Sequence, residues 1–224
     1  MLLIFKAVLW ALKIALVVYI GLCLLLFLRQ SALVYFPSAE ILQTPAEIGL
    51  AYEDVQLLTS DGLCLAAWYV PFPDAQKTVL ICHGNGGNIG DRLPVINLFH
   101  EMRLNVLIFD YRGYGGSAGR PSETGTYRDA MAAWQYLELK RGIAPGNIVV
   151  FGRSLGGAVA AQLAQQKAPG ALILEATFTS IPELADRFYP WLPIRWLCRF
   201  SYNTLERMPK INCPVMIAHS RDDE

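Results

Sequence analysis

A Gly-x-Ser-x-Gly sequence between an apolar strand-like run and a helix of small residues constrains the fold of this chain most. The apolar run covers residues 148–151, the turn covers residues 152–156, and an alanine-rich stretch follows. A strand that turns this sharply into a helix holds the central serine on a strained turn, with its hydroxyl exposed above the end of a sheet. A Cβ atom at Gly152 or Gly156 would collide with the neighbouring strand or helix at so close a crossing. The pattern makes Ser154 a candidate nucleophile; the alternative is a glycine-rich turn with an incidental serine.

Apolar runs of strand length alternate with helical patterns through most of the chain. The apolar runs cover residues 78–82, 106–109, 148–151, 171–174 and 213–219. The helical patterns cover residues 91–102, 124–141 and 155–166. Continuously apolar runs are typical of strands buried on both faces of a parallel sheet. The alternation predicts the α/β class, with a mostly parallel central sheet and helices on both faces.

Two further strand-like runs, residues 52–59 and 63–70, precede these elements. Ser60, Asp61 and Gly62 separate the two runs, and an Asp-Gly pair in this position is a strong hairpin signal. We therefore expect an antiparallel hairpin before the first parallel strand.

The amino-terminal stretch is almost wholly apolar, and Lys6 and Lys13 are its only charged side chains before Arg29. A helix over residues 7–28 is about 33 Å long, enough to cross the hydrocarbon core of a membrane if Lys13 snorkels. The alternative is a cleaved signal peptide, but no convincing small-x-small cleavage site precedes the domain, and Arg29 follows the apolar run directly. We expect a single-pass, uncleaved membrane anchor (a signal-anchor) over residues 1–30. The excess of positive charge at its amino end predicts that the domain lies on the non-cytoplasmic side.

The composition divides the chain into the anchor, a connector and one domain. A connector with two prolines covers residues 31–50, and the sheet-forming domain covers residues 51–224. Within that domain, residues 177–207 interrupt the alternation and are rich in aromatic side chains, Trp191 and Trp196 among them. Such an excursion lies over the carboxyl edge of a parallel sheet, where substrates bind. It is either a lid that binds an acyl chain or a lipid, or a packed pair of helices.

The charge balance and the cysteines argue against several classes of site. Nineteen basic and nineteen acidic residues leave no net charge, so we expect no nucleic-acid partner. The five cysteines are odd in number and have no Cys-x-x-Cys spacing, which argues against a zinc site and a disulfide framework. We expect neither a metal nor a cofactor.

A glycine-rich loop, residues 83–88, follows the buried run at 78–82. Glycines let backbone amides approach a ligand, and a His-Gly pair here matches a loop that supplies half of an oxyanion hole. We assign the two oxyanion donors to the backbone amides of Asn85 and Leu155, and we interpret His83 as a residue that organises the loop. The alternative is a plain flexible loop. A phosphate-binding P-loop would need a Gly-Lys-Ser/Thr sequence, which is missing.

Five segments occur in an order that resembles the α/β-hydrolase superfamily. They are residues 83–88, 110–115, 119–123, 152–157 and 175–180. From about residue 37 onward, the chain looks most similar to the small membrane-anchored serine hydrolases of this superfamily, a group that includes depalmitoylase-like enzymes. The resemblance implies the α/β-hydrolase fold, with Ser154 as the nucleophile and Asn85 and Leu155 as the oxyanion residues.

The resemblance also implies a catalytic triad whose acid follows the last apolar run. We assign the acid to Asp223 in preference to Asp222, with Glu175 as a weaker candidate. In this fold the order is Ser, then Asp or Glu, then His, but no histidine follows Asp223. We interpret His100 and His219 as structural. We therefore expect a C-terminally truncated, inactive chain that lacks the last strand, the last helix and the catalytic histidine.

Two functions follow from these expectations. The first is a membrane-anchored serine hydrolase that cleaves carboxylic ester or thioester bonds through an acyl-enzyme on Ser154. Its partners would be the membrane and an acyl ester or thioester substrate, either a lipid or an acylated protein. The alternative is a noncatalytic binding protein with the same fold, tethered to the membrane.

Overall fold

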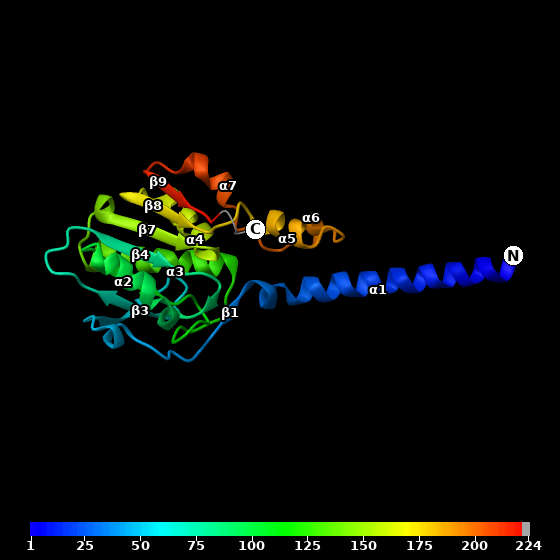
Figure 1. Cartoon of the computed structure of the whole chain (residues 1–224), viewed down its shortest axis with the longest axis horizontal. Helices are drawn as coiled ribbons and strands as arrows, with labels where there is room; N and C mark the ends of the chain where they lie inside the picture. The colour runs from blue at the N-terminus through cyan, green and yellow to red at the C-terminus, as the bar shows by residue number, and fades with distance from the viewer. Residues whose placement is uncertain (221–224) are drawn as a thin grey trace.

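Seven strands form one sheet in the order β2-β3-β6-β4-β7-β8-β9 (Figure 1). The computed structural model describes residues 1–220. The strands are β2 (Glu53–Leu58), β3 (Cys64–Val70), β4 (Thr78–Cys82), β6 (Asn105–Phe109), β7 (Ile148–Arg153), β8 (Ala171–Glu175) and β9 (Val215–Ala218). β2 and β3 form the predicted antiparallel hairpin, and the other five strands run parallel to one another. The predicted α/β class and the mostly parallel sheet are confirmed.

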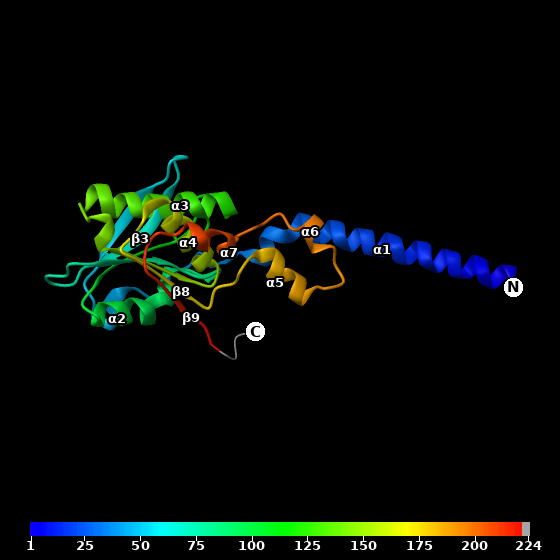
Figure 2. The ribbon, with the colours of Figure 1, turned by 90° about the horizontal axis from the view of Figure 1, so that it is seen from above.

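Apolar side chains fill both faces of the sheet. Alternate residues of β4 serve the two layers: Leu80 packs in the core under α3 (Glu123–Gln135) and α4 (Leu155–Lys167). Val79 and Ile81 pack in the core on the other face, under α2 (Leu93–Glu101). Figure 2 shows α2 on one side of the sheet and α3 and α4 on the other. Burial on both faces explains why the run at 78–82 is continuously apolar.

Short elements complete the domain. β1 (Phe36–Pro37) and β5 (Gly86–Gly87) form a parallel two-residue pair outside the main sheet. The helix predicted at residues 124–141 is α3 followed by a π-helical turn over Tyr136–Lys140. Four 3₁₀ turns cover Pro45–Ile48, Ile89–Arg92, Pro145–Asn147 and Met208–Lys210.

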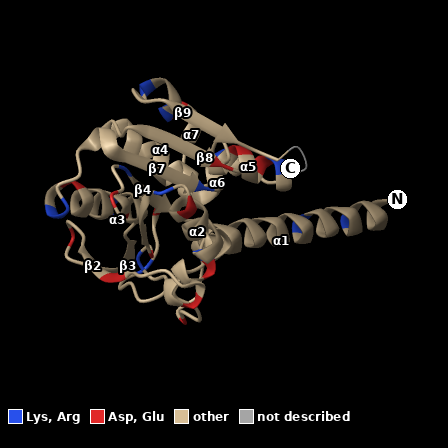
Figure 3. Cartoon of the chain, turned by 60° about the vertical axis from the view of Figure 1, so that its left-hand side comes forward, with Lys and Arg blue, Asp and Glu red and all other residues tan. Residues whose placement is uncertain are grey.

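Helix α1 (Leu2–Val34) projects away from the domain (Figure 1). By length and composition it could cross a membrane, with a mean hydropathy of 2.6 in its most apolar window. Figure 3 shows that few charged residues lie along it. The helix continues four residues beyond the anchor predicted at residues 1–30, into the predicted connector at 31–50. Near this end of the helix, the side-chain oxygen of Gln30 accepts a hydrogen bond from the Arg199 backbone N at 2.8 Å.

The aromatic excursion at residues 177–207 contains three short helices. They are α5 (Ile181–Phe188), α6 (Ile194–Leu197) and α7 (Thr204–Arg207). α7 contacts α4 on the sheet, whereas α5 and α6 lie beside α1 in both views of the ribbon (Figures 1 and 2). The hydroxyl of Tyr19 donates to the carbonyl oxygen of Trp191 at 3.0 Å. The excursion therefore extends from the sheet edge along the apolar helix.

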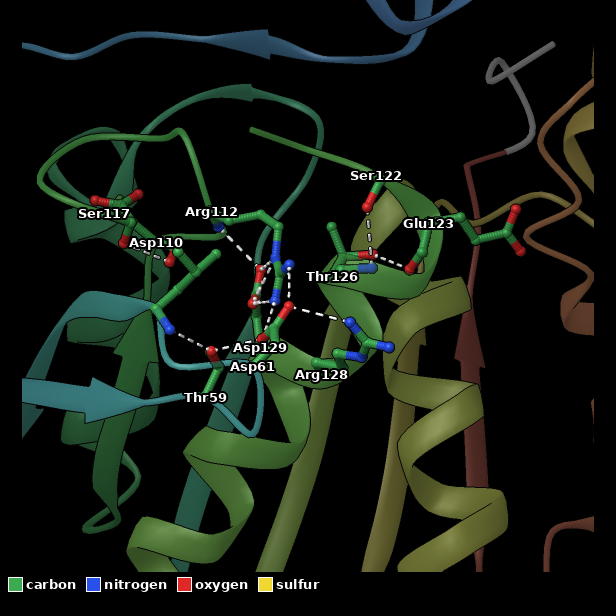
Figure 4. Close-up of polar contacts among 12 residues, drawn as sticks. Thr59, Asp61, Asp110, Arg112, Ser117, Ser122, Glu123, Thr126, Arg128 and Asp129 are labelled. Carbon is green, nitrogen blue, oxygen red and sulfur yellow. Dashed lines mark hydrogen bonds and ion pairs between the residues drawn. The ribbon is translucent and has the colours of Figure 1, made fainter. Parts of the chain in front are cut away.

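A buried arginine connects the hairpin, the loop after β6 and helix α3 (Figure 4). The Arg112 backbone N and side-chain Nε each donate to the Asp129 carboxylate at 2.9 Å, and Nη2 donates to it at 2.8 Å. Its Nη1 donates to Asp61 at 2.9 Å, and Arg128 reaches the same carboxylate at 3.1 Å. The pKa of Asp61 is lower than the ordinary value for an aspartate, mainly because its carboxylate accepts hydrogen bonds from Arg112.

This pKa shift predicts a loss of stability in acid. Because the pKa of Asp61 is lower in the folded chain than in the unfolded chain, its ion pairs stabilise the fold above the unfolded pKa of about 3.9. The contribution is lost as the pH falls below that value toward the folded pKa. We expect the thermal unfolding midpoint of the Asp61→Asn variant to lie below wild type at pH 7, with the gap closing below about pH 4. A gap that is constant from pH 7 to pH 3 would contradict this role.

Candidate functional site

Ser154 lies at the turn between β7 and α4, at the carboxyl end of the parallel strands. Its backbone has φ 52° and ψ −119°, a conformation that non-glycine residues rarely adopt and that persists only where the surroundings impose it. Its backbone N donates to the Glu175 carbonyl oxygen at 2.9 Å, and its carbonyl oxygen accepts from Gly157 N and Thr177 Oγ1, both at 2.9 Å. These contacts hold the strained turn expected of a nucleophile elbow.

Two glycines allow the turn to cross its neighbours closely. A Cβ atom on Gly156 would lie 2.0 Å from the carbonyl oxygen of Cys82, and one on Gly152 would lie 2.4 Å from that of Gly156. Both contacts are with backbone atoms, which cannot rotate away. The structure thus shows the steric reason for glycine at both positions that the motif predicted.

The glycine-rich loop after β4 passes directly beside Ser154. A Cβ atom on Gly84 would lie 3.7 Å from the Cβ atom of Ser154, which is van der Waals distance. The next residue, Asn85, is fixed from three directions: its carbonyl oxygen accepts from Phe36 N at 2.9 Å and from the Tyr114 hydroxyl at 2.8 Å, and its side chain donates to the Val34 carbonyl at 3.1 Å. The oxyanion loop is therefore held by the end of α1 and by the loop after β6.

Leu155 is the first residue of α4, directly after the serine. The first amides of a helix have no partner within it, and the positive end of the helix dipole favours negative charge there. The structure thus brings the two backbone segments named as oxyanion donors, at Asn85 and Leu155, to the same side of the sheet as Ser154. This arrangement suits a site where negative charge develops on an oxygen atom.

His83 is buried behind the loop rather than beside the serine hydroxyl. Its Nδ1 contacts the Gly84 carbonyl oxygen at 2.7 Å, and its ring lies 4.5 Å from the Tyr111 ring. Burial, followed by the charge of Arg92, lowers the pKa of His83 to about 3, so the ring is neutral at physiological pH. This position agrees with the interpretation of His83 as a residue that organises the loop.

Asp110, at the end of β6, is the acidic neighbour of His83. Its Oδ1 lies 3.6 Å from His83 Nε2, too far for a hydrogen bond, and accepts one from Ile89 N at 2.9 Å. Burial raises the pKa of Asp110 to about 7. With a neutral imidazole opposite it, the carboxyl group contributes to the shape of the loop and forms no ion pair with His83.

A cavity of about 760 Å³ opens at Ser154, and His219 also lines it. The strand register explains this: Arg153 pairs with Glu175 and Glu175 with Ala218, so the residues that follow lie in one line across three strands. Adjacent strands lie about 4.8 Å apart, so β7 and β9, the strands that precede these two residues, are separated by about twice that spacing. The interpretation of His219 as structural does not predict that it lines the cavity at Ser154. Its place directly after a parallel strand is the signal in the sequence that could have indicated this position.

The remaining candidates lie elsewhere. His100 on α2 contacts the Pro71 carbonyl oxygen at 3.2 Å, near the amino ends of the parallel strands and thus at the opposite edge of the sheet. Glu175 forms an ion pair with Arg153 at 3.7 Å. Asp222 and Asp223 fall outside the described residues. Within residues 1–220, no three His, Cys, Asp or Glu side chains gather as a metal ion would require.

Comparisons with known proteins agree with this geometry. The family described as the alpha/beta hydrolase fold matches residues 77–208, more than half of the chain. An uncharacterized protein of Mycobacterium tuberculosis is 40% identical over 206 residues, which cover 91% of this chain and 73% of that protein. The alpha/beta hydrolase domain-containing protein WAV2 of Arabidopsis thaliana is 38% identical over 223 residues, covering 89% of this chain and 72% of that protein.

Among solved structures, an esterase of Pyrococcus furiosus superposes with a TM-score of 0.66 and 23% identity, covering 82% of this chain and 76% of that one. At this identity the likeness concerns the fold alone. The assignment to a family depends instead on the family match over residues 77–208 and on the identities of 40% and 38% to the two relatives. The chain belongs to the alpha/beta hydrolase fold family.

Proposed function

We propose that this protein is a membrane-anchored serine hydrolase that cleaves carboxylic ester or thioester bonds through an acyl-enzyme on Ser154. The observation that carries the proposal is the strained turn at Ser154, beside which Gly84 lies so close that a Cβ atom added to it would be 3.7 Å from the Ser154 Cβ atom. A serine held at positive φ costs folding energy, which a merely structural turn would avoid by using glycine.

The chemistry follows from the groups around the serine. Ser154 Oγ attacks the acyl carbonyl carbon and gives its proton to a general base, while the amides of Asn85 and Leu155 stabilise the oxyanion. The tetrahedral intermediate collapses, and the alcohol or thiol leaves with the proton from the base. Water, deprotonated by the same base, then attacks the acyl-enzyme and releases the carboxylic acid. The positive end of α4 favours the negative charge in both steps.

The general base in this proposal is a histidine oriented by Asp223 or Asp222, a role that the positions of the histidines in these 224 residues do not favour. The chain has three histidines. The ring of His83 is buried with its Nδ1 on the backbone, and His100 lies at the other edge of the sheet. His219 lines the cavity, but β8 lies between its strand and that of Ser154, and it precedes the acid in the chain.

A fluorophosphonate probe tests the nucleophile, because it reacts with an activated serine hydroxyl. We expect the protein isolated from membranes of the cell that makes it to be labelled at Ser154, and the Ser154→Ala variant to lose at least about 99% of the label. The Ser60→Ala variant, which alters an exposed serine in the β2–β3 turn, is the control and should label as wild type. A folded protein that never labels would favour the noncatalytic binding protein instead.

The anchor makes a separate prediction. The isolated protein should begin near Met1, fractionate with membranes and resist extraction by salt, because a helix such as α1 inserts through apolar area rather than charge. Contacts of Gln30 with Arg199 and of Val34 with Asn85 would be lost or weakened if the helix were removed. Amino-terminal sequencing that finds a start between Ser31 and Ala39 would instead indicate a cleaved signal peptide.

A further inference from the structure

A second cavity, of about 470 Å³, lies between the last turns of α1 and the helices α5 and α6. α1 contributes Leu26, Gln30, Leu33 and Val34 to its wall, and α5 contributes Ile181, Leu184, Ala185 and Phe188. No charged side chain lines it within the described part of the chain. A volume of this size is typical of small-molecule sites, and its ligand must be apolar.

Helix α5 forms the partition between this apolar cavity and the cavity at Ser154. Its Leu184 and Phe188 line both, one turn apart on the helix. Ile181 and Ala185 face only the apolar cavity, whereas Glu183 faces only the serine cavity. The spacing of the apolar positions, three and four residues apart, is that of one helix face. A ligand that passes Leu184 and Phe188 would occupy both cavities.

If α1 spans a membrane over residues 7–28, the apolar cavity begins at the boundary of the bilayer, with Leu26 inside the span and Gln30, Leu33 and Val34 beyond it. The excursion covers about 22 Å of α1, from the Tyr19 hydrogen bond with Trp191 to Val34. The uncovered part of the helix, residues 2–18, is about 26 Å long, less than a hydrocarbon core of about 30 Å. The tip of the excursion, which lies beside α1 in both views of the ribbon (Figures 1 and 2), would therefore reach a bilayer that α1 spans.

The exposed side chains of the excursion suit that position. Phe188, Trp191 and Trp196 are 63%, 53% and 88% exposed, and neither tryptophan lines either cavity. Tryptophan side chains gather at membrane interfaces, where one end of the ring is apolar and the other wet. Trp191 and Trp196 are thus exposed outside both cavities, where they are available to a membrane surface.

We propose that the cavity between α1 and α5–α6 binds one acyl chain of a membrane lipid ester, so that the anchor helix is itself a wall of the substrate site. The inference rests on the proposed hydrolase function, which places the ester carbonyl at Ser154. The acyl chain runs from there past Leu184 and Phe188 to Leu26 and Leu33. Because the cavity begins at the boundary of the bilayer, the acyl chain can enter it directly from the lipid.

Photo-crosslinking tests whether a lipid acyl chain occupies the apolar cavity, and it does not require the protein to be catalytically active. The 224-residue chain is placed in nanodiscs of phosphatidylcholine that carries a diazirine on one acyl chain. The measured quantity is the ratio of label on residues 181–188 to label on residues 2–18, which face bulk lipid. Filling the cavity with Ala185→Phe should lower this ratio about tenfold, because an overpacked site excludes the ligand. Ala32→Phe, on the exposed surface of α1 outside the cavity, should leave it unchanged.

A second pair of variants alters only the anchor, so that a folding defect in α5 cannot mimic the result. Leu26→Trp should lower the ratio like Ala185→Phe, and Leu28→Trp, on the 63% exposed side of the same helix, should not. A ratio that neither Ala185→Phe nor Leu26→Trp changes would overturn the proposal. The proposal would also be overturned if a photoreactive palmitoylated peptide labelled residues 181–188 and the photoreactive phospholipid did not.

The Ser154→Ala variant separates this inference from the proposed function. It should crosslink at residues 181–188 as wild type does, because the acyl chain binds without reacting. Crosslinking there, together with a failure of fluorophosphonate to label the protein isolated from membranes of the cell that makes it, would support the lipid site and defeat the hydrolase. Fluorophosphonate labelling of Ser154 without crosslinking at residues 181–188 would defeat the lipid site alone.

Discussion

A polypeptide of these 224 residues is expected to hydrolyse p-nitrophenyl butyrate no faster than its Ser154→Ala variant. Serine is a weak nucleophile at its ordinary pKa and needs an adjacent base to take its proton. In a Ser-His-Asp triad, removing the histidine costs about as much as removing all three members, roughly a factor of a million in turnover. The oxyanion amides still give roughly a thousandfold advantage over water, but that part does not depend on Ser154.

His219 decides whether this expectation holds, because it is the histidine that shares a cavity with Ser154. A general base must come within about 2.6–3.2 Å of the hydroxyl it serves, and the two residues are separated by β8. Clear turnover that both Ser154→Ala and His219→Ala abolish would make His219 the base and overturn the prediction. His100→Ala is the matched control, since its ring contacts Pro71 at the other edge of the sheet.

Much of the fold could be predicted from the sequence because it depends on local pattern. The run at residues 78–82 is apolar throughout because both of its faces are buried, and the structure confirms a central strand there. Asp61 and Gly62 predicted the hairpin, and the two glycines beside Ser154 predicted a crossing that the backbone distances show. Each of these features is encoded within a few consecutive residues, so a single sequence can reveal it.

Contacts between distant segments could not be predicted in this way. Gln30 and Arg199 are separated by 169 positions, yet a hydrogen bond joins them near the end of α1. The apolar cavity arises because α5 and α6 fold back along α1, and nothing in the periodicity of either segment indicates the other. His219 came close to the serine only through the order of the strands, which places β9 two positions from β7. Such positions follow from topology rather than from residue spacing.

Replacing Asp129 with alanine is expected to lower the free energy of unfolding by about 3 kcal/mol. The Arg112 side chain is only 7% exposed, and the Asp129 carboxylate accepts from its backbone N, its Nε and its Nη2 (Figure 4). Without the carboxylate these donors are left buried and unpaired, which costs more than the pair itself contributes. The value stays at the low end of the usual range because Asp61 still accepts from Nη1. Urea unfolding in detergent, followed by tryptophan fluorescence, measures it.

Two further variants show whether the buried charges of Arg112 and Asp129 or the backbone hydrogen bond between these residues determine the loss of stability. Arg128→Ala removes an ion pair with Asp61 whose arginine is half exposed, and should cost less than about 1 kcal/mol. Arg112→Met combined with Asp129→Leu removes both buried charges and should be far less destabilising than Asp129→Ala alone, because no buried charge is left uncompensated. If the double variant is as unstable as Asp129→Ala, the backbone hydrogen bond from Arg112 N carries the energy instead. That bond fixes the start of the loop whose Tyr114 holds the carbonyl of Asn85, so its loss would also reduce fluorophosphonate labelling of Ser154.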